Sequence, residues 1–121
     1  MIEDLTKLIS PNYDLLIVLM IVMLLDVITG VIGAFINKEF NSTTFRQGLF
    51  KKVYEIILIL VAYIIDYVLK VDYIGTALLT MCIGLEIYSI VIENISKYVP
   101  IPDWLKDIIE HLRASDKQKE E

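Results

Sequence analysis

The sequence predicts an all-α membrane protein with three transmembrane helices and a C-terminal amphipathic helix, assembled into an oligomer. Three observations favour this fold class. The chain of 121 residues is 56% hydrophobic, and its mean hydropathy is +0.63. Its charged residues, 22% of the chain, gather mainly in residues 1–14, in one central segment and in residues 92–121. Between them lie three apolar runs long enough to cross a bilayer.

The three runs are residues 15–36, 53–71 and 73–92. As helices they span about 33, 28 and 30 Å, and the hydrocarbon core of a bilayer is about 30 Å thick. The first run contains Asp26, which costs about 2.5–3.5 kcal/mol on insertion scales, but each of its many Leu, Ile and Val residues returns about 0.3–0.6 kcal/mol. We therefore expect residues 15–36 to insert.

The second run is the weakest because Glu55, Asp66 and Lys70 interrupt it. Glu55 and Lys70 lie near its ends, where long side chains reach the interface. Because the second and third runs adjoin closely, we expect a helical hairpin around residues 70–73. A soluble all-helical core is a less favoured alternative.

The basic residues predict the orientation in the membrane. Nine of the eleven lysine and arginine residues lie either in the connection 37–52 or in the tail 93–121. The positive-inside rule therefore predicts a cytoplasmic loop at 37–52, a cytoplasmic C-terminal tail and an extracytoplasmic tail at residues 1–14. We expect Arg46, Lys51 and Lys52 at the membrane interface.

The C-terminal tail changes character at residues 99–102, where two prolines prevent the third span from continuing. Apolar residues then follow at helical spacing and predict an amphipathic helix over residues 103–113. This helix would lie either in the membrane interface, with Trp104 among the headgroups, or against a partner subunit. We expect residues 114–121, which are charged and lack large apolar side chains, to be disordered.

Each span carries a stripe of small, polar or acidic residues at helical spacing. Asp26 and Glu86 fall at similar depths and would meet near the membrane midplane, where two close carboxyls resist double ionisation and share a proton. Asp66 lies nearer the outer boundary. These stripes either pack the bundle or line a pore and an oligomer interface. The candidate pore and oligomerisation residues are Asp26, Thr29, Gly30, Gly33, Asp66, Glu86, Ser89 and Glu93.

The composition excludes several classes of function. A net charge of −5 and a pI near 4.8 argue against a nucleic-acid partner. The single cysteine, Cys82, excludes a disulfide framework and a cysteine-based metal site, and the single histidine, His111, leaves no histidine cluster. The hydroxyl groups of Thr29 and Ser89 have no accompanying base. We therefore expect no catalytic, cofactor or metal site, and no enzymatic activity.

Five motifs in order along the chain resemble the phage lysis and toxin-secretion holin family. They are Leu25-Asp26-x-x-Thr29-Gly30, Asn41-Ser42 with Arg46-x-Gly48-x-x-Lys51-Lys52, an acid at Asp66, Glu86-x-x-Ser89-x-x-x-Glu93-Asn94, and Pro100-x-Pro102-x-x-Leu105. The resemblance covers residues 15–112. It implies a small protein that accumulates in the bacterial cytoplasmic membrane, associates with itself and opens lesions at a set time. Its partners would be the lipid bilayer, further copies of itself, and an endolysin or large toxin that escapes through the lesion.

Two other classes suit the residues alone. A small ion channel, or the membrane subunit of a transporter, would also have acids facing inward and a basic cytoplasmic loop. A passive membrane anchor would dock a soluble partner through residues 104–112, but an anchor does not need an acid in every span.

Overall fold

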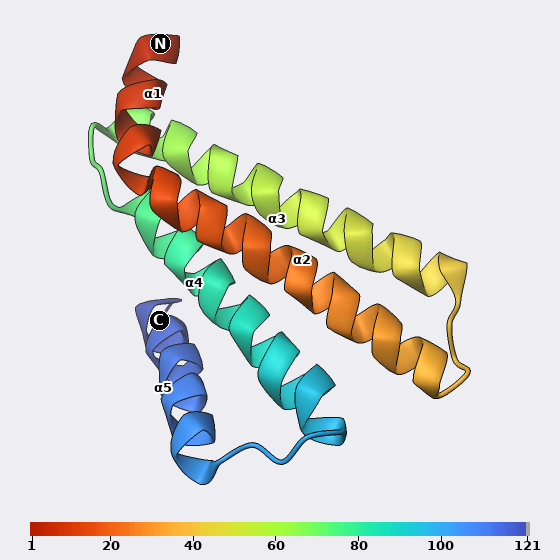
Figure 1. Cartoon of the computed structure of the whole chain (residues 1–121). Helices are drawn as coiled ribbons and strands as arrows, with labels where there is room; N and C mark the ends of the chain where they lie inside the picture. Colours follow the sequence, from red (N-terminus) through yellow and green to blue (C-terminus); the bar gives the residue numbers. More distant parts are fainter. Residues whose placement is uncertain (121) are drawn as a thin grey trace.

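The computed structural model describes the backbone of residues 1–120 and the side chains of residues 1–112. Over this range the chain is helical, which confirms the all-α class. Three long helices follow one another in alternating directions, and a shorter helix lies at each end (Figure 1). The elements are α1 (Ile2–Ile9), the 3-10 turn η1 (Ser10–Asn12), α2 (Tyr13–Ile36), α3 (Ser42–Leu69), α4 (Ile74–Tyr88), the π-helical segment η2 (Ser89–Asn94), the 3-10 turn η3 (Ile95–Lys97) and α5 (Asp103–Glu120).

Two continuous helical stretches, Ile2–Ile36 and Ile74–Lys97, have the length and hydropathy needed to cross a membrane. Helix α3 is also long enough, but it is not one of these stretches because too many charged residues fall within its apolar part. Its first turns are polar, and Glu55 and Asp66 interrupt its apolar part. The third crossing, through α3, therefore remains a prediction.

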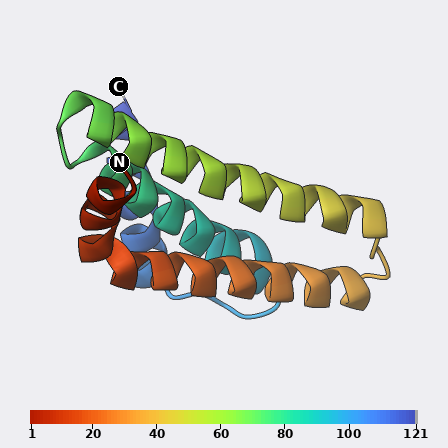
Figure 2. The same ribbon diagram turned by 90° about the horizontal axis from the view of Figure 1, so that it is seen from above.

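Helix α4 lies between α2 and α3 and contacts both (Figure 2). Helices α2 and α3 touch each other little, because each has its largest contact with α4. Helix α1 packs against α3 at the opposite end. Near that end the three long helices share one apolar core, which consists of Leu19, Met23, Ile59, Tyr63, Leu79, Cys82 and Ile83.

The prediction of a basic loop through residue 52 is wrong. The turn between α2 and α3 is short, because Asn41 caps a helix that begins at Ser42. The side-chain oxygen of Asn41 accepts a hydrogen bond from the Thr43 amide at 2.8 Å, as an N-cap residue does. Arg46, Lys51 and Lys52 therefore lie on the first turns of α3 rather than in a loop.

Both ends of the chain contain more helix than expected. Residues 1–14, predicted only as a tail, hold α1 and the start of α2. Helix α5 continues to Glu120, beyond the expected end at residue 113; the side chains of residues 113–120 and all of residue 121, which include the stretch expected to be disordered, lie outside the described residues. Alanine, lysine, glutamine and glutamate all favour helix, so the lack of large apolar residues does not end it.

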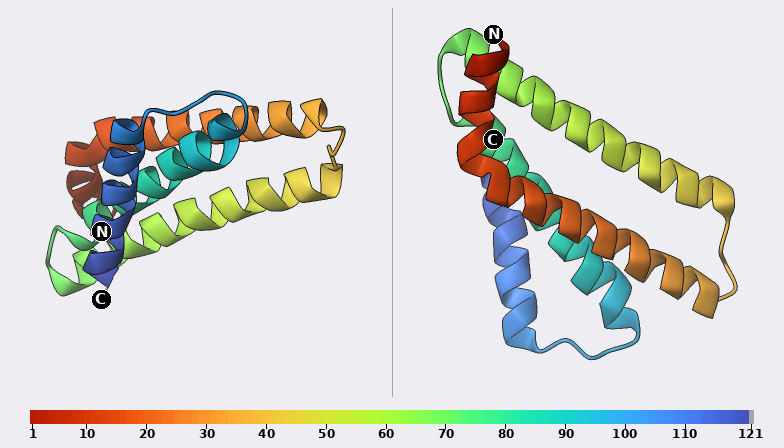
Figure 3. Two further views of the ribbon diagram at one scale, coloured as in Figure 1. Left: turned by 90° about the horizontal axis from the view of Figure 1, so that it is seen from below. Right: turned by 45° about the horizontal axis from the view of Figure 1, so that its top comes forward.

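Helix α5 folds back along α4 of the same chain (Figures 1 and 3). Ile109 is buried, whereas Trp104, Ile108 and Leu112 form an exposed apolar stripe. Trp104 remains 65% exposed. The predicted amphipathic face is therefore divided between a contact within the chain and a free surface.

Candidate functional site

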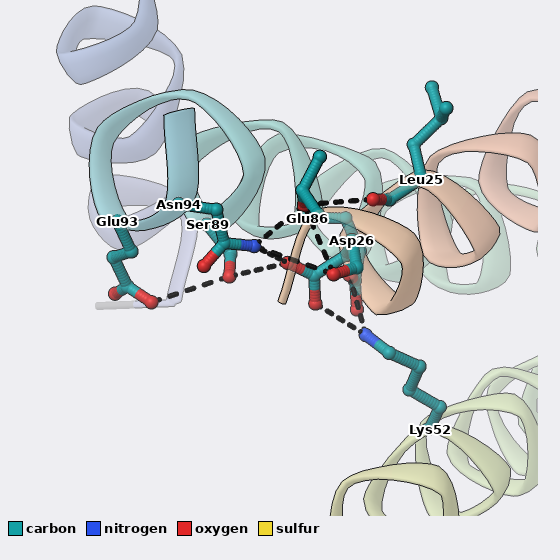
Figure 4. A network of polar contacts seen from close by, with 8 residues as sticks. Leu25, Asp26, Lys52, Glu86, Ser89, Glu93 and Asn94 are labelled. Carbon is teal, nitrogen blue, oxygen red and sulfur yellow. Dashed lines mark hydrogen bonds and ion pairs between the residues drawn. The ribbon is translucent and has the colours of Figure 1, made fainter. Parts of the chain in front are cut away.

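Three charged residues from three different helices meet between α2, α3 and α4 (Figure 4). The ammonium nitrogen of Lys52 lies 2.8 Å from a carboxylate oxygen of Asp26 and 2.8 Å from one of Glu86. The side chains are 16%, 16% and 6% exposed for Lys52, Asp26 and Glu86. We refer to these three residues as the ion cluster. The prediction that Asp26 and Glu86 meet agrees with this geometry, and Lys52 bridges the two carboxyl groups.

The antiparallel order of the helices explains why these residues meet. Asp26 lies near the middle of α2, and α3 returns alongside it so that Lys52, three turns into α3, reaches the same level. Glu86 lies near the end of α4, which runs in the same direction as α2. Charged groups in an apolar bundle are stable only when they pair, and each member of the ion cluster supplies a partner that the others need.

A second layer of polar groups holds Asp26 in place. The hydroxyl of Ser89 and the amide of Asn94 donate hydrogen bonds to one carboxylate oxygen of Asp26, at 2.8 and 3.0 Å. The Asn94 amide also donates to the hydroxyl of Thr29 at 2.8 Å. The other carboxylate oxygen of Asp26 is the one that binds Lys52. Asp26 is therefore satisfied on both oxygens, by η2 on one and by α3 on the other.

The π-helical segment η2 makes this arrangement possible. In an α-helix, residues five apart point about 140° away from each other. The wider π-turn, with i to i+5 hydrogen bonds, brings such residues toward one face. Ser89 and Asn94 are five apart, and both reach the same oxygen of Asp26. Such π-turns occur frequently at functional sites.

Two further acids border the ion cluster. Glu93 accepts a weak hydrogen bond from Ser89 at 3.3 Å and lies at the rim. Glu55, one turn after Lys52 on α3, interacts with the carboxyl of Glu86. Its Oε2 atom is buried without a hydrogen-bond partner. The site thus carries more carboxyl groups than cations.

Asp66 has a different role from the one predicted for it. It lies in the α3–α4 hairpin, far along the chain from the ion cluster, and is 1% exposed. Its two oxygens accept hydrogen bonds from the backbone amides of Ile74 and Gly75 at 2.9 and 2.8 Å. Asp66 therefore caps the first turn of α4 from the neighbouring helix, satisfying amides that have no partner within α4.

The two glycines predicted at an oligomer interface, Gly30 and Gly33, are not tightly packed within the chain. A Cβ atom added to Gly30 would lie 4.0 Å from the nearest side chain, and one added to Gly33 would lie 3.5 Å from Tyr98. Neither glycine is needed for close packing within the chain. The glycine that is needed is Gly75, where a Cβ would lie 2.6 Å from the ring of Tyr63.

The residues predicted at the membrane interface also separate. Arg46 and Lys51 are exposed, as is Trp104, whereas Lys52 points into the bundle. Lys52 was not predicted as a member of the site, and Asn94 was not predicted as a hydrogen-bond donor to Asp26. A signal for Lys52 was present: Lys52, Glu55, Ile59, Ala62 and Asp66 follow one another at spacings of 3, 4, 3 and 4, which places them on one face of a helix.

Among the side chains that the structure describes, no group of three or more histidine, cysteine, aspartate or glutamate residues could hold a metal ion. The polar residues instead form a network of ion pairs and hydrogen bonds between helices. Such a network holds helices together in an apolar medium, and its free energy changes sharply when water enters.

The comparison with known families agrees with this arrangement. The model of the bacteriophage holin family matches residues 5–114, which is nearly the whole chain. The chain belongs to the bacteriophage holin family. No curated protein and no solved structure matches it. The resemblance seen in the motifs is thereby confirmed, and this holin is a membrane protein of a pore-forming family rather than of an enzyme class.

The structure also explains why two of the motifs accompany each other. The motif Leu25–Gly30 supplies Asp26 and Thr29, and the motif Glu86–Asn94 supplies Glu86, Ser89 and Asn94. In this holin the two motifs are one site, built from α2, the end of α4 and η2. The basic motif on α3 adds Lys52.

Proposed function

We propose that this holin accumulates in the bacterial cytoplasmic membrane, associates with further copies of itself and opens lesions at a set time. An endolysin, or a large toxin, then leaves the cytoplasm through the lesion. Membership of the holin family supports this function. The observation that carries it is the ion cluster, because a charged network inside an apolar bundle provides two states of different hydration.

In the proposed topology α2, α3 and α4 cross the membrane, the N-terminus is outside and the C-terminus is in the cytoplasm. The distribution of lysine and arginine supports this orientation. Arg46, Lys51 and Trp104 then lie near the cytoplasmic interface. Helix α5 carries exposed charges at Lys106 and Asp107, whose burial in hydrocarbon would cost about 2.5–3.5 kcal/mol each. In a bilayer α5 therefore belongs at the interface and not among the acyl chains.

The ion cluster is suited to act as a latch. In the closed state its charges are shielded from lipid and satisfied within one chain. A buried ion pair is costly to form, and its stability depends on every partner being present. Once water enters between the helices, the same charges are hydrated and no longer hold α2, α3 and α4 together. Water entry in one subunit thus favours opening in its neighbours, which makes the transition abrupt.

The test is inducible expression in a bacterium that also produces a cytoplasmic endolysin. We expect an abrupt loss of viability after a delay, together with release of endolysin activity into the medium. Cells that make only the endolysin are the control and should stay intact. A small ion channel would depolarise the membrane and leave the endolysin inside, so depolarisation without release contradicts the proposal.

A further inference from the structure

From the end of the molecule that holds the α2–α3 turn, one cavity reaches the ion cluster and a second reaches Asn94, which hydrogen-bonds Asp26. The smaller one, about 160 Å³, lies between α2 and the segments η2 and η3. Its walls are largely polar and include Thr29, Asn37, Asn94 and Tyr98. The larger one, about 240 Å³, lies between the second half of α2 and the first turns of α3, and Asp26 and Lys52 line it.

Glycines keep these cavities open. Gly30 lines both of them, and Gly48 lines the larger one. A Cβ at Gly30 would have its nearest neighbour at 4.0 Å, and a Cβ at Gly48 would meet nothing within 4 Å. Side chains at these positions would therefore extend into the cavities, and the sequence leaves that space free.

Both cavities are large enough for water. The smaller one is largely polar, whereas the wall of the larger one is mostly apolar and has Asp26 and Lys52 as its charged groups. A water molecule occupies about 30 Å³ and needs two to four polar partners. The smaller cavity therefore has room for about five molecules, and its hydroxyl and amide groups supply such partners. The exposure within the ion cluster agrees, since Asp26 and Lys52, which line the larger cavity, are 16% exposed and Glu86 is 6% exposed.

The other side of the ion cluster is closed. Toward α1 and the α3–α4 hairpin the helices are joined by the apolar core, in which Leu19, Tyr63 and Leu79 are at most 2% exposed. The Tyr63 hydroxyl in this core accepts a hydrogen bond from the side-chain amide of Asn12.

We propose that the two cavities form a one-sided aqueous vestibule that brings water from the cytoplasmic side to Asp26 and Lys52. That this side is the cytoplasmic one rests on the proposed topology. That the vestibule opens on one side only rests on the cavities and the apolar core, and is independent of the topology. Hydration from one end lowers the cost of keeping an ion pair at this depth. It also means that solutes and protons of the cytoplasm, and not those outside the cell, reach the ion cluster in the closed state.

The test is cysteine labelling of membrane vesicles of both orientations with a small, charged, membrane-impermeant methanethiosulfonate reagent, read as the mass of the full-length chain. The vestibule variants are Gly30→Cys and Gly48→Cys. The unmodified protein is one control, because its Cys82 lies in the apolar core. Val61→Cys, exposed on α3 toward lipid, is the second. Glu3→Cys and Ser115→Cys mark the two ends of the chain.

We expect Gly30→Cys and Gly48→Cys to be labelled from the same side as Ser115→Cys and not from the side of Glu3→Cys. The unmodified protein and Val61→Cys should remain unlabelled. Labelling of neither glycine variant from either side, or labelling from the side of Glu3→Cys, would overturn the vestibule. If Ser115→Cys is itself labelled from outside the cell, the proposed topology fails, while labelling of Gly30→Cys from that same side still supports a one-sided vestibule.

Discussion

At the scale of single residues, neighbouring lysines have opposite environments. Lys51 is exposed, whereas Lys52 binds two carboxylates inside the bundle. The rotation of about 100° per helical residue is enough to separate them. Lys51 therefore contributes to a basic surface, whereas Lys52 contributes its charge to the ion cluster.

Gly75 gives the clearest prediction for a single residue. Gly75→Ala should destabilise the protein by about 1–3 kcal/mol, because the new Cβ would lie 2.6 Å from the ring of Tyr63 and overpacked sites cost that much. The control is Gly48→Ala on α3, where nothing lies within 4 Å and alanine favours helix by about 1 kcal/mol. Thermal melting of the helical circular dichroism signal in one detergent measures both. Equal melting temperatures for Gly75→Ala and Gly48→Ala would contradict the packing described here.

At the scale of elements, the α3–α4 hairpin is organised by one side chain. Asp66 links the last turns of α3 to the first amides of α4. The backbone carbonyl of Asp66 also accepts a hydrogen bond from the backbone amide of Val71 in the turn. Lys70 ends α3 in the left-handed conformation, with φ of 61°.

We expect Asp66→Ala to destabilise the hairpin by about 1–2 kcal/mol, the usual cost of losing a helix cap. Asp72→Ala, in the same turn but exposed, is the matched control and should be neutral. Hydrogen exchange of the amides of Ile74 and Gly75 reports the effect locally and should be faster only in Asp66→Ala. Unchanged exchange in that variant would mean that α4 starts without this cap.

The sequence predicts the helical class and the approximate positions of the long helices, since apolar runs are visible without a structure. Their ends are harder to predict, because hydropathy cannot show that Asn41 starts α3 before the basic residues. The meeting of Asp26 and Glu86 follows from depth alone. Lys52 was not identified because its direction depends on the rotation of α3 about its axis. Asn94 was not identified because its contact with Asp26 depends on a π-turn, which a search for a 3.6-residue period does not detect.

At the scale of the whole molecule, two kinds of contact hold the three long helices together. Toward α1 they share an apolar core, and toward the α2–α3 turn they share the ion cluster and cavities. Water does not enter the apolar core favourably, because apolar side chains gain nothing from hydration. The charges of the ion cluster, in contrast, are stabilised by water. The half of the bundle near the turn is therefore the half in which we expect opening to begin.

The central claim is that the ion cluster sets the balance between the closed and open states. Lys52→Met leaves two acids facing each other without their cation, which destabilises the closed state, so lysis should come early. The triple variant Asp26→Asn, Lys52→Met, Glu86→Gln removes every charge of the cluster. Uncharged replacements of buried ion pairs are often neutral or stabilising, and they leave no charge for water to stabilise in the open state, so lysis should come late or not at all. Each shift of about 1.4 kcal/mol changes the balance tenfold.

The most direct measurement is the time from induction to lysis at matched membrane levels of the wild type, Lys52→Met and the triple variant. Lys51→Met and Asp103→Asn, which change exposed charges, serve as controls and should lyse at the wild-type time. We expect shifts of opposite sign, with early lysis for Lys52→Met and late lysis for the triple variant. Lysis of both at the wild-type time, or shifts of both in the same direction, would contradict the central claim.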